Sequence, residues 1–214
     1  MSNEFLKRTL SSLILIPLVL FIIIKGSIYF YVFLIIIFFI SSYEWINLVK
    51  DRYFILYGNL FMLLSLYCIH ELRFGFGDNF IILLFITGIC VSTDIGGYIF
   101  GKIFKGPKLI KYSPNKTYSG LFGSFLFSFL LMPVCFYYNL FHYDQGFKLL
   151  LFLFIISASS QFGDIFVSYF KRKSNIKDTG KLIPGHGGLL DRIDGMIFAF
   201  PVAYLLLVFN FLNI

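Results

Sequence analysis

An unusual concentration of charge and glycine lies in residues 168–194 of an otherwise apolar chain. The basic side chains there are Lys171, Arg172, Lys173, Lys177 and Lys181. The glycines, which let backbone amides approach a ligand closely, are Gly185, Gly187 and Gly188. The carboxylates, hard oxygen ligands of the kind that Mg²⁺ prefers, are Asp178, Asp191 and Asp194. Together these residues predict phosphoryl chemistry on a lipid at the edge of a membrane.

A polar stripe precedes this segment. Ser157, Gln161, Asp164 and Ser168 recur at positions i, i+4, i+7 and i+11, which share one face of a helix. Ser and Gln have a structural alternative, because they commonly hydrogen-bond across membrane helices. A carboxylate near the centre of such a helix costs ~2.5–3.5 kcal/mol on insertion scales and is by default functional. Asp164 is therefore predicted to be a metal ligand or a catalytic group.

Asp191 and Asp194 are three residues apart where another apolar helix is expected to begin. This spacing places both carboxylates on one helical face, although they also suit simple dipole partners of a helix N-terminus. If this helix packs against the one that carries Asp164, then Asp164 and Asp191 share a Mg²⁺ ion, with Asp194 as a third candidate ligand. His186 lies among the glycines and is either a phosphate contact or a general base.

A further polar group occurs earlier, in residues 92–98 (STDIGGY) and 113–117 (SPNKT). Its Asp94 is a second carboxylate within an apolar segment and has the same functional default as Asp164.

Residues 168–194 resemble, position by position, the signature of the phosphatidate cytidylyltransferases (CDP-diacylglycerol synthases). The resemblance spans residues 92–198. Residues 92–98 and 113–117 are similar to the family's S-D-T-x-A-Y and S-P-K-K-T-W-E-G segments, and residues 43–45 (YEW) are a weaker echo. The chain departs from the pattern at Gly97, where Ala is usual, at Asn115, where Lys is usual, and at Tyr118 and Ser119, where Trp and Glu are usual.

The resemblance implies a nucleotidyltransferase of phospholipid biosynthesis that converts CTP and phosphatidate into CDP-diacylglycerol and pyrophosphate. It implies Mg²⁺ as cofactor and leaves open a monovalent cation beside it. The implied catalytic residues are Asp164, Lys171, Arg172, Lys177, Asp178, His186 and Asp191. The implied substrate-binding residues are Ser92, Asp94, Lys116, Thr117, Ser168, Gly187, Gly188 and Arg192. The expected partners are CTP, phosphatidate and membrane phospholipids, with no nucleic acid; a homodimer is left open.

The rest of the chain predicts an all-α, polytopic integral membrane protein with about seven transmembrane helices, in a range of seven to nine. The mean hydropathy of +0.85, with 14% charged residues, lies well outside the soluble range. The predicted spans are residues 9–24, 27–43, 54–70, 79–100, 117–141, 147–170 and 194–212. One membrane-embedded domain is expected, with N-terminal helices in 1–78 and catalytic helices and loops in 79–214.

The distribution of basic residues predicts the orientation. Lys and Arg concentrate in the N-terminal segment, around residues 50–52 and in the loops 101–116 and 171–192. The positive-inside rule places these parts in the cytoplasm, at the cell (inner) membrane, where CTP would enter. The net charge of +7 also suits an anionic nucleotide or head group. Two alternatives remain: a CTP-dependent lipid or polyprenol kinase, and a transporter with intramembrane carboxylates.

Overall fold

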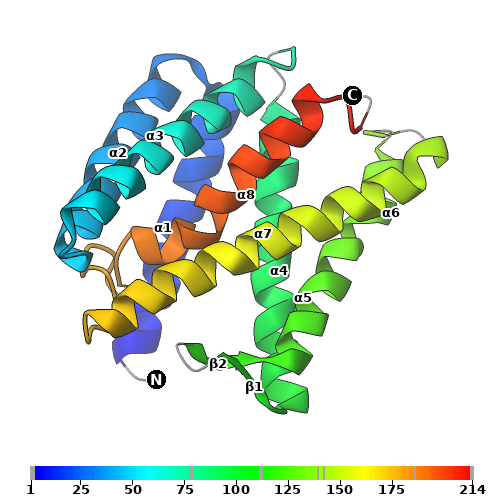
Figure 1. Cartoon of the computed structure of the whole chain (residues 1–214). Coiled ribbons are helices and arrows are strands. Elements are labelled where there is room, and N and C mark those ends of the chain that lie inside the picture. The colour runs from blue at the N-terminus through cyan, green and yellow to red at the C-terminus, as the bar shows by residue number, and fades with distance from the viewer. Residues whose placement is uncertain are drawn as a thin grey trace. The chain divides into compact units, whose positions relative to one another are not determined.

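The computed structural model describes residues 3–77, 80–110, 113–138, 140–141, 143–185 and 187–212, without the side chains of residues 3–8, 114 and 115. The described residues are mostly helical (Figure 1). In chain order the elements are α1 (Asn3–Lys25), α2 (Ser27–Leu48), α3 (Arg52–Phe74), α4 (Phe80–Phe104), β1 (Lys108–Ile110), β2 (Ser113–Thr117), α5 (Tyr118–Phe129), α6 (Leu131–Tyr137), η1 (Tyr143–Gln145), α7 (Gly146–Lys173) and α8 (Leu190–Val208).

Each of the seven predicted spans overlaps at least one helix of the described residues, but the number of membrane crossings is not confirmed. Within the described residues, five helical stretches are long and apolar enough to cross a membrane: Ser27–Leu48, Arg52–Phe74, Phe80–Phe104, Tyr118–Tyr137 and Tyr143–Lys173. The apolar part of α1, Thr9–Lys25, is a shorter helix. Helix α8 begins with Asp191, Arg192 and Asp194, so three charges lie in its first five residues.

Two local features differ from the prediction. The expected helix over residues 117–141 is divided into α5 and α6, because Pro133 has no N–H to donate to the carbonyl of Phe129. The loop 101–116 contains a small antiparallel hairpin of β1 and β2, in which Lys108 pairs with Thr117 and Ile110 with Ser113. The protein is therefore nearly, but not entirely, all-α.

The chain forms two compact units. The first comprises Met1–Ile82 and Phe170–Asp194, and the second comprises Leu83–Tyr169 and Gly195–Ile214. Each unit therefore combines early and late segments of the chain, and both α7 and α8 contribute residues to both. The expected single membrane-embedded domain stays a prediction.

In the first unit, α2 packs against α1 and α3 around buried residues such as Phe30, Leu48 and Leu72. In the second, α4 and α5 approach closely through glycines on both helices. A Cβ atom on Gly97 would lie 2.6 Å from Ser124 Oγ, which explains why glycine replaces the family's usual alanine there.

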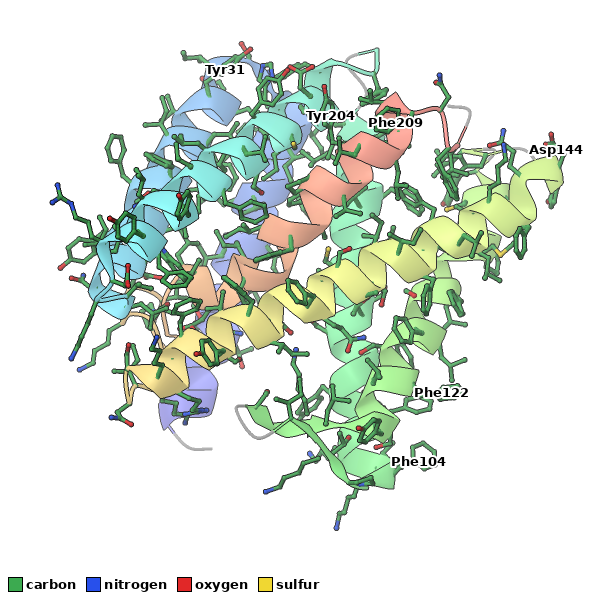
Figure 2. The ribbon with its side chains drawn as sticks, in the orientation of Figure 1. Tyr31, Phe104, Phe122, Asp144, Tyr204 and Phe209 are labelled. Carbon is green, nitrogen blue, oxygen red and sulfur yellow. The ribbon has the colours of Figure 1, made fainter. Side chains whose placement is uncertain are left out.

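Large apolar side chains cover much of the outer surface of these helices. Figure 2 labels Tyr31 on α2, Phe104 on α4 and Phe122 on α5, and all three are exposed. Helices surrounded by lipid present apolar side chains outward in this way, because the hydrocarbon core is itself apolar. The exposed surface therefore agrees with a membrane protein.

Candidate active site

The first polar cluster lies in the second unit, where the hairpin meets α7. Lys116 on β2 donates from Nζ to Asp164 Oδ2 at 2.7 Å and to the carbonyl of Gln161 at 3.5 Å. The next residue, Thr117, caps α5 by accepting the N–H of Gly120 on its Oγ1 at 3.1 Å. The hairpin and the cap thus fix the strand that presents the Lys116 ammonium to the Asp164 carboxylate.

The polar face of α7 around Asp164 packs against α4 and α8. Ser157 is fully buried and accepts a hydrogen bond from Thr93 of α4, with 2.8 Å between the two hydroxyl oxygens. Gly195 of α8 lies directly against α7, since a Cβ atom there would be 2.5 Å from Ser160 Oγ and 3.4 Å from Asp164 Oδ1. The backbone of α8 therefore passes close to the Asp164 carboxylate.

The second polar cluster lies in the first unit and is built around Asp191. Lys171 Nζ donates to Asp191 Oδ1 at 2.8 Å, and the side chains of these two residues are only 13% and 5% exposed. The backbone N–H groups of Thr179 and Gly188 donate to Asp191 Oδ2 at 2.8 and 3.1 Å. Burial alone would raise the pKa of Asp191. The hydrogen bond and charge of Lys171, with the two N–H groups, outweigh burial and hold the pKa below its ordinary value.

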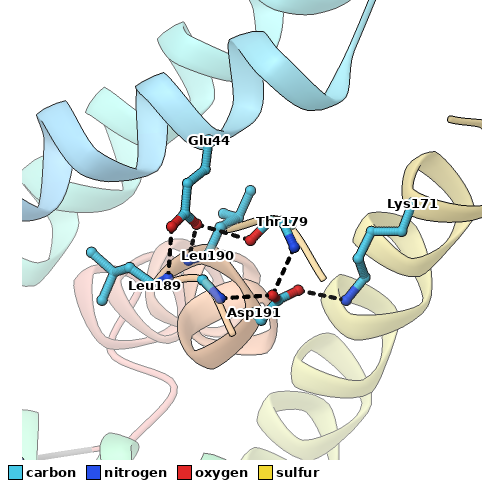
Figure 3. Close-up of polar contacts among 7 residues, drawn as sticks. Glu44, Lys171, Thr179, Leu189, Leu190 and Asp191 are labelled. Atoms are coloured by element: carbon cyan, nitrogen blue, oxygen red, sulfur yellow. Dashed lines mark hydrogen bonds and ion pairs between the residues drawn. The ribbon is translucent and has the colours of Figure 1, made fainter. Parts of the chain in front are cut away.

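A second carboxylate, that of Glu44 on α2, also accepts hydrogen bonds from this cluster (Figure 3). It is 4% exposed. Its Oε2 accepts the Thr179 hydroxyl at 2.9 Å and the Leu190 N–H at 2.8 Å, and its Oε1 accepts the Leu189 N–H at 2.9 Å. Thr179 therefore bridges two carboxylates, donating its hydroxyl to Glu44 and its N–H to Asp191.

Between Thr179 and Leu190 the chain forms a loop, here called the 179–190 loop. Ile183 and Gly187 exchange two backbone hydrogen bonds, at 2.9 and 3.2 Å. Gly187 has a φ of 88°, which suits glycine. Gly188 is buried against Glu44, where a Cβ atom would lie 2.5 Å from Oε2. Lys177 and Asp178, just before the loop, are exposed. His186 lies outside the described residues.

The remaining predicted residues occupy separate positions. Asp94, Arg172 and Arg192 are exposed, Ser92 and Ser168 are half-buried, and Asp194 is buried. Asp164 belongs to the second unit and Asp191 to the first, so their shared Mg²⁺ ion stays a prediction. Among the described side chains, no group of three or more His, Cys, Asp or Glu residues lies together in a way that could hold a metal ion.

Comparison with known proteins shows the family of the chain. A model described as "Cytidylyltransferase family" matches residues 54–210. The chain belongs to this family. A phosphatidate cytidylyltransferase from Rickettsia felis is 36% identical over 204 residues, covering 92% of this chain and 89% of the relative. One from Rickettsia conorii is 35% identical over 215 residues, covering 97% and 93%, and one from Staphylococcus epidermidis is 40% identical over 127 residues, covering 59% and 48%.

Sequence reasoning missed Glu44 and Thr179 as members of the second polar cluster. Glu44 lies outside the stretch matched by the family model and appeared only as a weak echo in residues 43–45. A usable signal was present, because a carboxylate near the end of a long apolar run is by default functional. For Thr179 the sequence offers no comparable signal, since an isolated threonine in a polar loop is ordinary.

Proposed function

We infer that the protein is a phosphatidate cytidylyltransferase, which transfers the cytidylyl group of CTP to phosphatidate and releases pyrophosphate. The observation that carries this inference is the similarity to relatives of that name along more than nine-tenths of the chain. The match also favours a cytidylyltransferase over the lipid kinase and transporter alternatives. The two lysine–carboxylate clusters supply charges that such a reaction needs.

Lys116 and Lys171 keep their proposed roles as phosphate contacts. Each ammonium group is oriented by a carboxylate at 2.7 or 2.8 Å, so little side-chain freedom remains to be lost when a phosphate oxygen binds. Lys177 and Arg172 are exposed near Lys171 in the sequence and would add positive charge for the anionic substrates. Ser92, Thr117, Ser168 and Arg192 keep their proposed substrate-binding roles.

Asp164 fits a divalent cation. Its Oδ2 already holds one cationic group, the Lys116 ammonium, and Mg²⁺ commonly takes only one or two protein carboxylates with the remaining ligands from phosphates and water. Asp191 fits less readily, because three donors already engage its carboxylate; its main proposed role is to anchor the 179–190 loop. Bound Mg²⁺ would neutralise the triphosphate charge. Asp194 stays a further candidate ligand.

The proposed reaction is an in-line displacement. A phosphatidate oxygen forms a bond to the α-phosphorus of CTP while the bond from that phosphorus to the β-phosphate oxygen breaks, and pyrophosphate departs with its electron pair. The lysines stabilise the charge that develops on the departing group. The diacyl chains of phosphatidate would stay in the bilayer, and the basic loops would face the cytoplasm, where CTP is dissolved.

The experiment is a transfer assay with purified protein in detergent micelles, radiolabelled CTP, phosphatidate and Mg²⁺. Label should pass into an organic-extractable liponucleotide only when both substrates are present. Lys116→Ala should lower kcat/KM for CTP roughly tenfold to a hundredfold, since a charge-assisted contact contributes ~1.5–3 kcal/mol. Lys108→Ala, on the exposed end of the same hairpin, is the matched control and should behave as wild type. A wild-type protein that transfers no label to lipid would overturn the assignment.

A further inference from the structure

The first backbone N–H groups of α8 find their acceptor far away in the sequence. A helix N-terminus leaves backbone N–H groups without partners, and Ser, Thr, Asp or Asn at the first position usually accepts them. Here Leu189 precedes the helix and cannot do so. The acceptor is Glu44, which lies 145 residues earlier and takes the N–H groups of Leu189 and Leu190. A cap from so far away connects the helix start to a particular place on α2.

The same carboxylate fixes the other end of the loop. Thr179 donates its hydroxyl to Glu44 Oε2, so both ends of the 179–190 loop attach to one side chain (Figure 3). The fit is tight, because Cβ atoms on Gly180 and Gly188 would lie 2.6 and 2.5 Å from the Glu44 oxygens. We call Glu44, Thr179, Leu189 and Leu190 the Glu44 clamp. The loop cannot shift without breaking it.

The end of α2 around Glu44 is itself firmly placed. Trp45 donates from Nε1 to the carbonyl of Phe54 at 3.0 Å, and its ring packs edge-on against Phe170 with 5.0 Å between centroids. The Ser174 hydroxyl donates to the carbonyl of Leu48 at 2.6 Å. The clamp therefore connects the loop to a rigid support within the first unit.

We propose that Glu44 is a positioning residue for cytidylyl transfer. It does not touch substrate. It acts by holding the 179–190 loop, and with it Asp191, in the arrangement that meets the nucleotide. The proposal rests on the inferred transferase activity. It makes the N-terminal helices part of the catalytic apparatus, although Glu44 lies outside the stretch of chain that the family model matches.

The test compares Glu44→Gln, Thr179→Val and Thr179→Ser, with Tyr43→Phe on the exposed neighbouring position as control. Glu44→Gln replaces an acceptor oxygen with an N–H donor that faces other donors. Thr179→Val removes only the hydroxyl, and Thr179→Ser keeps it. Three measurements follow on each protein: the kinetic constants for CTP and phosphatidate, the unfolding midpoint, and the rate of trypsin cleavage after Lys177 or Lys181, identified by fragment mass. Both lysines are exposed.

Glu44→Gln and Thr179→Val should each lower kcat at least tenfold and speed loop cleavage at least fivefold, with the KM for phosphatidate within twofold of wild type. Their double variant should be no worse than Glu44→Gln alone, because both changes break the same attachment. Thr179→Ser should keep wild-type turnover and wild-type resistance to trypsin, and Tyr43→Phe should match wild type.

A different pattern would overturn the proposal. If the variants lost only stability, with folded protein turning over at the wild-type rate, Glu44 would be a structural residue. If Glu44→Gln failed to fold, the comparison of Thr179→Val with Thr179→Ser would decide, since it changes one hydrogen bond of three. Wild-type protein without transferase activity would refute the proposed function instead, and unchanged loop cleavage in the variants would separately refute the clamp.

Discussion

The buried ion pair between Lys171 and Asp191 makes a quantitative prediction about stability. Removing one partner of a buried pair leaves an uncompensated charge and typically costs ~3–5 kcal/mol. The side chains of the pair are 13% and 5% exposed, so this buried regime applies. Asp191→Asn should fall in that range, because its amide N–H₂ must face either the Lys171 ammonium or the N–H groups of Thr179 and Gly188. Lys171→Met should cost less, since Asp191 keeps its two backbone donors.

The assay is equilibrium unfolding in mixed detergent micelles, followed by tryptophan fluorescence. Trp45 is the only tryptophan in the chain and packs against Phe170 in the same unit, so the signal reports this region. EDTA in every sample removes any effect of bound metal. Lys173→Met, an exposed change in the same turn of α7, is the control and should shift stability by less than about 0.5 kcal/mol.

The double variant Lys171→Met/Asp191→Asn gives the decisive comparison. Because it removes both charges together, its cost should be smaller than the sum of the single costs by about 0.5–3 kcal/mol. Strictly additive costs, or an Asp191→Asn variant within about 0.5 kcal/mol of wild type, would refute the reading of this pair as a buried anchor.

The pH dependence has a definite sign. The folded-state pKa of Asp191 lies below its ordinary value of 3.8, so the ionised form is favoured by folding. Its contribution to stability should be complete above about pH 4 to 5 and should be lost as the pH falls below 3.8 toward the folded-state pKa. Asp191→Asn should lack this part of the acid transition, and an unchanged acid profile in that variant would contradict the assignment.

Further predictions concern the second cluster, the loop and the orientation. Asp164→Asn should reduce turnover at least a hundredfold without a comparable loss of stability, whereas turnover above about a tenth of wild type would remove Asp164 from the list of metal ligands. Gly188→Ala should lower both stability and activity, because its Cβ would meet Glu44; a neutral result in melting and transfer assays would contradict the close approach. A cysteine at Lys108 should be shielded from an impermeant thiol reagent in intact cells and one at Asp144 should react, in a background without the three natural cysteines. The reverse labelling would overturn the predicted orientation.

The helices and most of the chemistry follow from local patterns of residue types along the chain. Apolar runs of about twenty residues can satisfy their backbone groups in lipid only as helices, and each predicted segment overlaps a helix of the described residues. The spacing of Ser157, Gln161 and Asp164 fixed one polar face of α7, because a helix repeats every 3.6 residues. The charged loop between residues 171 and 192 was recognisable for the same local reason, since lipid-facing helices exclude such a concentration of charge.

Local pattern was less reliable where an element depends on a single residue or on pairing. The hairpin of β1 and β2 has only three and five residues, too few to show a strand period. The division between α5 and α6 follows from one residue, Pro133, which has no N–H to donate to the carbonyl of Phe129. The count of crossings depends on the short apolar part of α1 and on the charged residues in the first turn of α8.

The partners of the carboxylates follow from the packing of the helices and not from local sequence. Glu44 meets Leu189 across 145 residues, and Lys116 meets Asp164 across 48. No periodicity in the sequence predicts contacts between residues so far apart in the chain. These contacts depend on how the helices pack and on the glycines that permit close approach. Asp191, predicted as a metal ligand, proved to be held by Lys171, Thr179 and Gly188. The residue types indicate the chemistry, and the packing of the fold determines which groups each carboxylate contacts. A buried charge is stable only where the fold supplies hydrogen-bond donors to it.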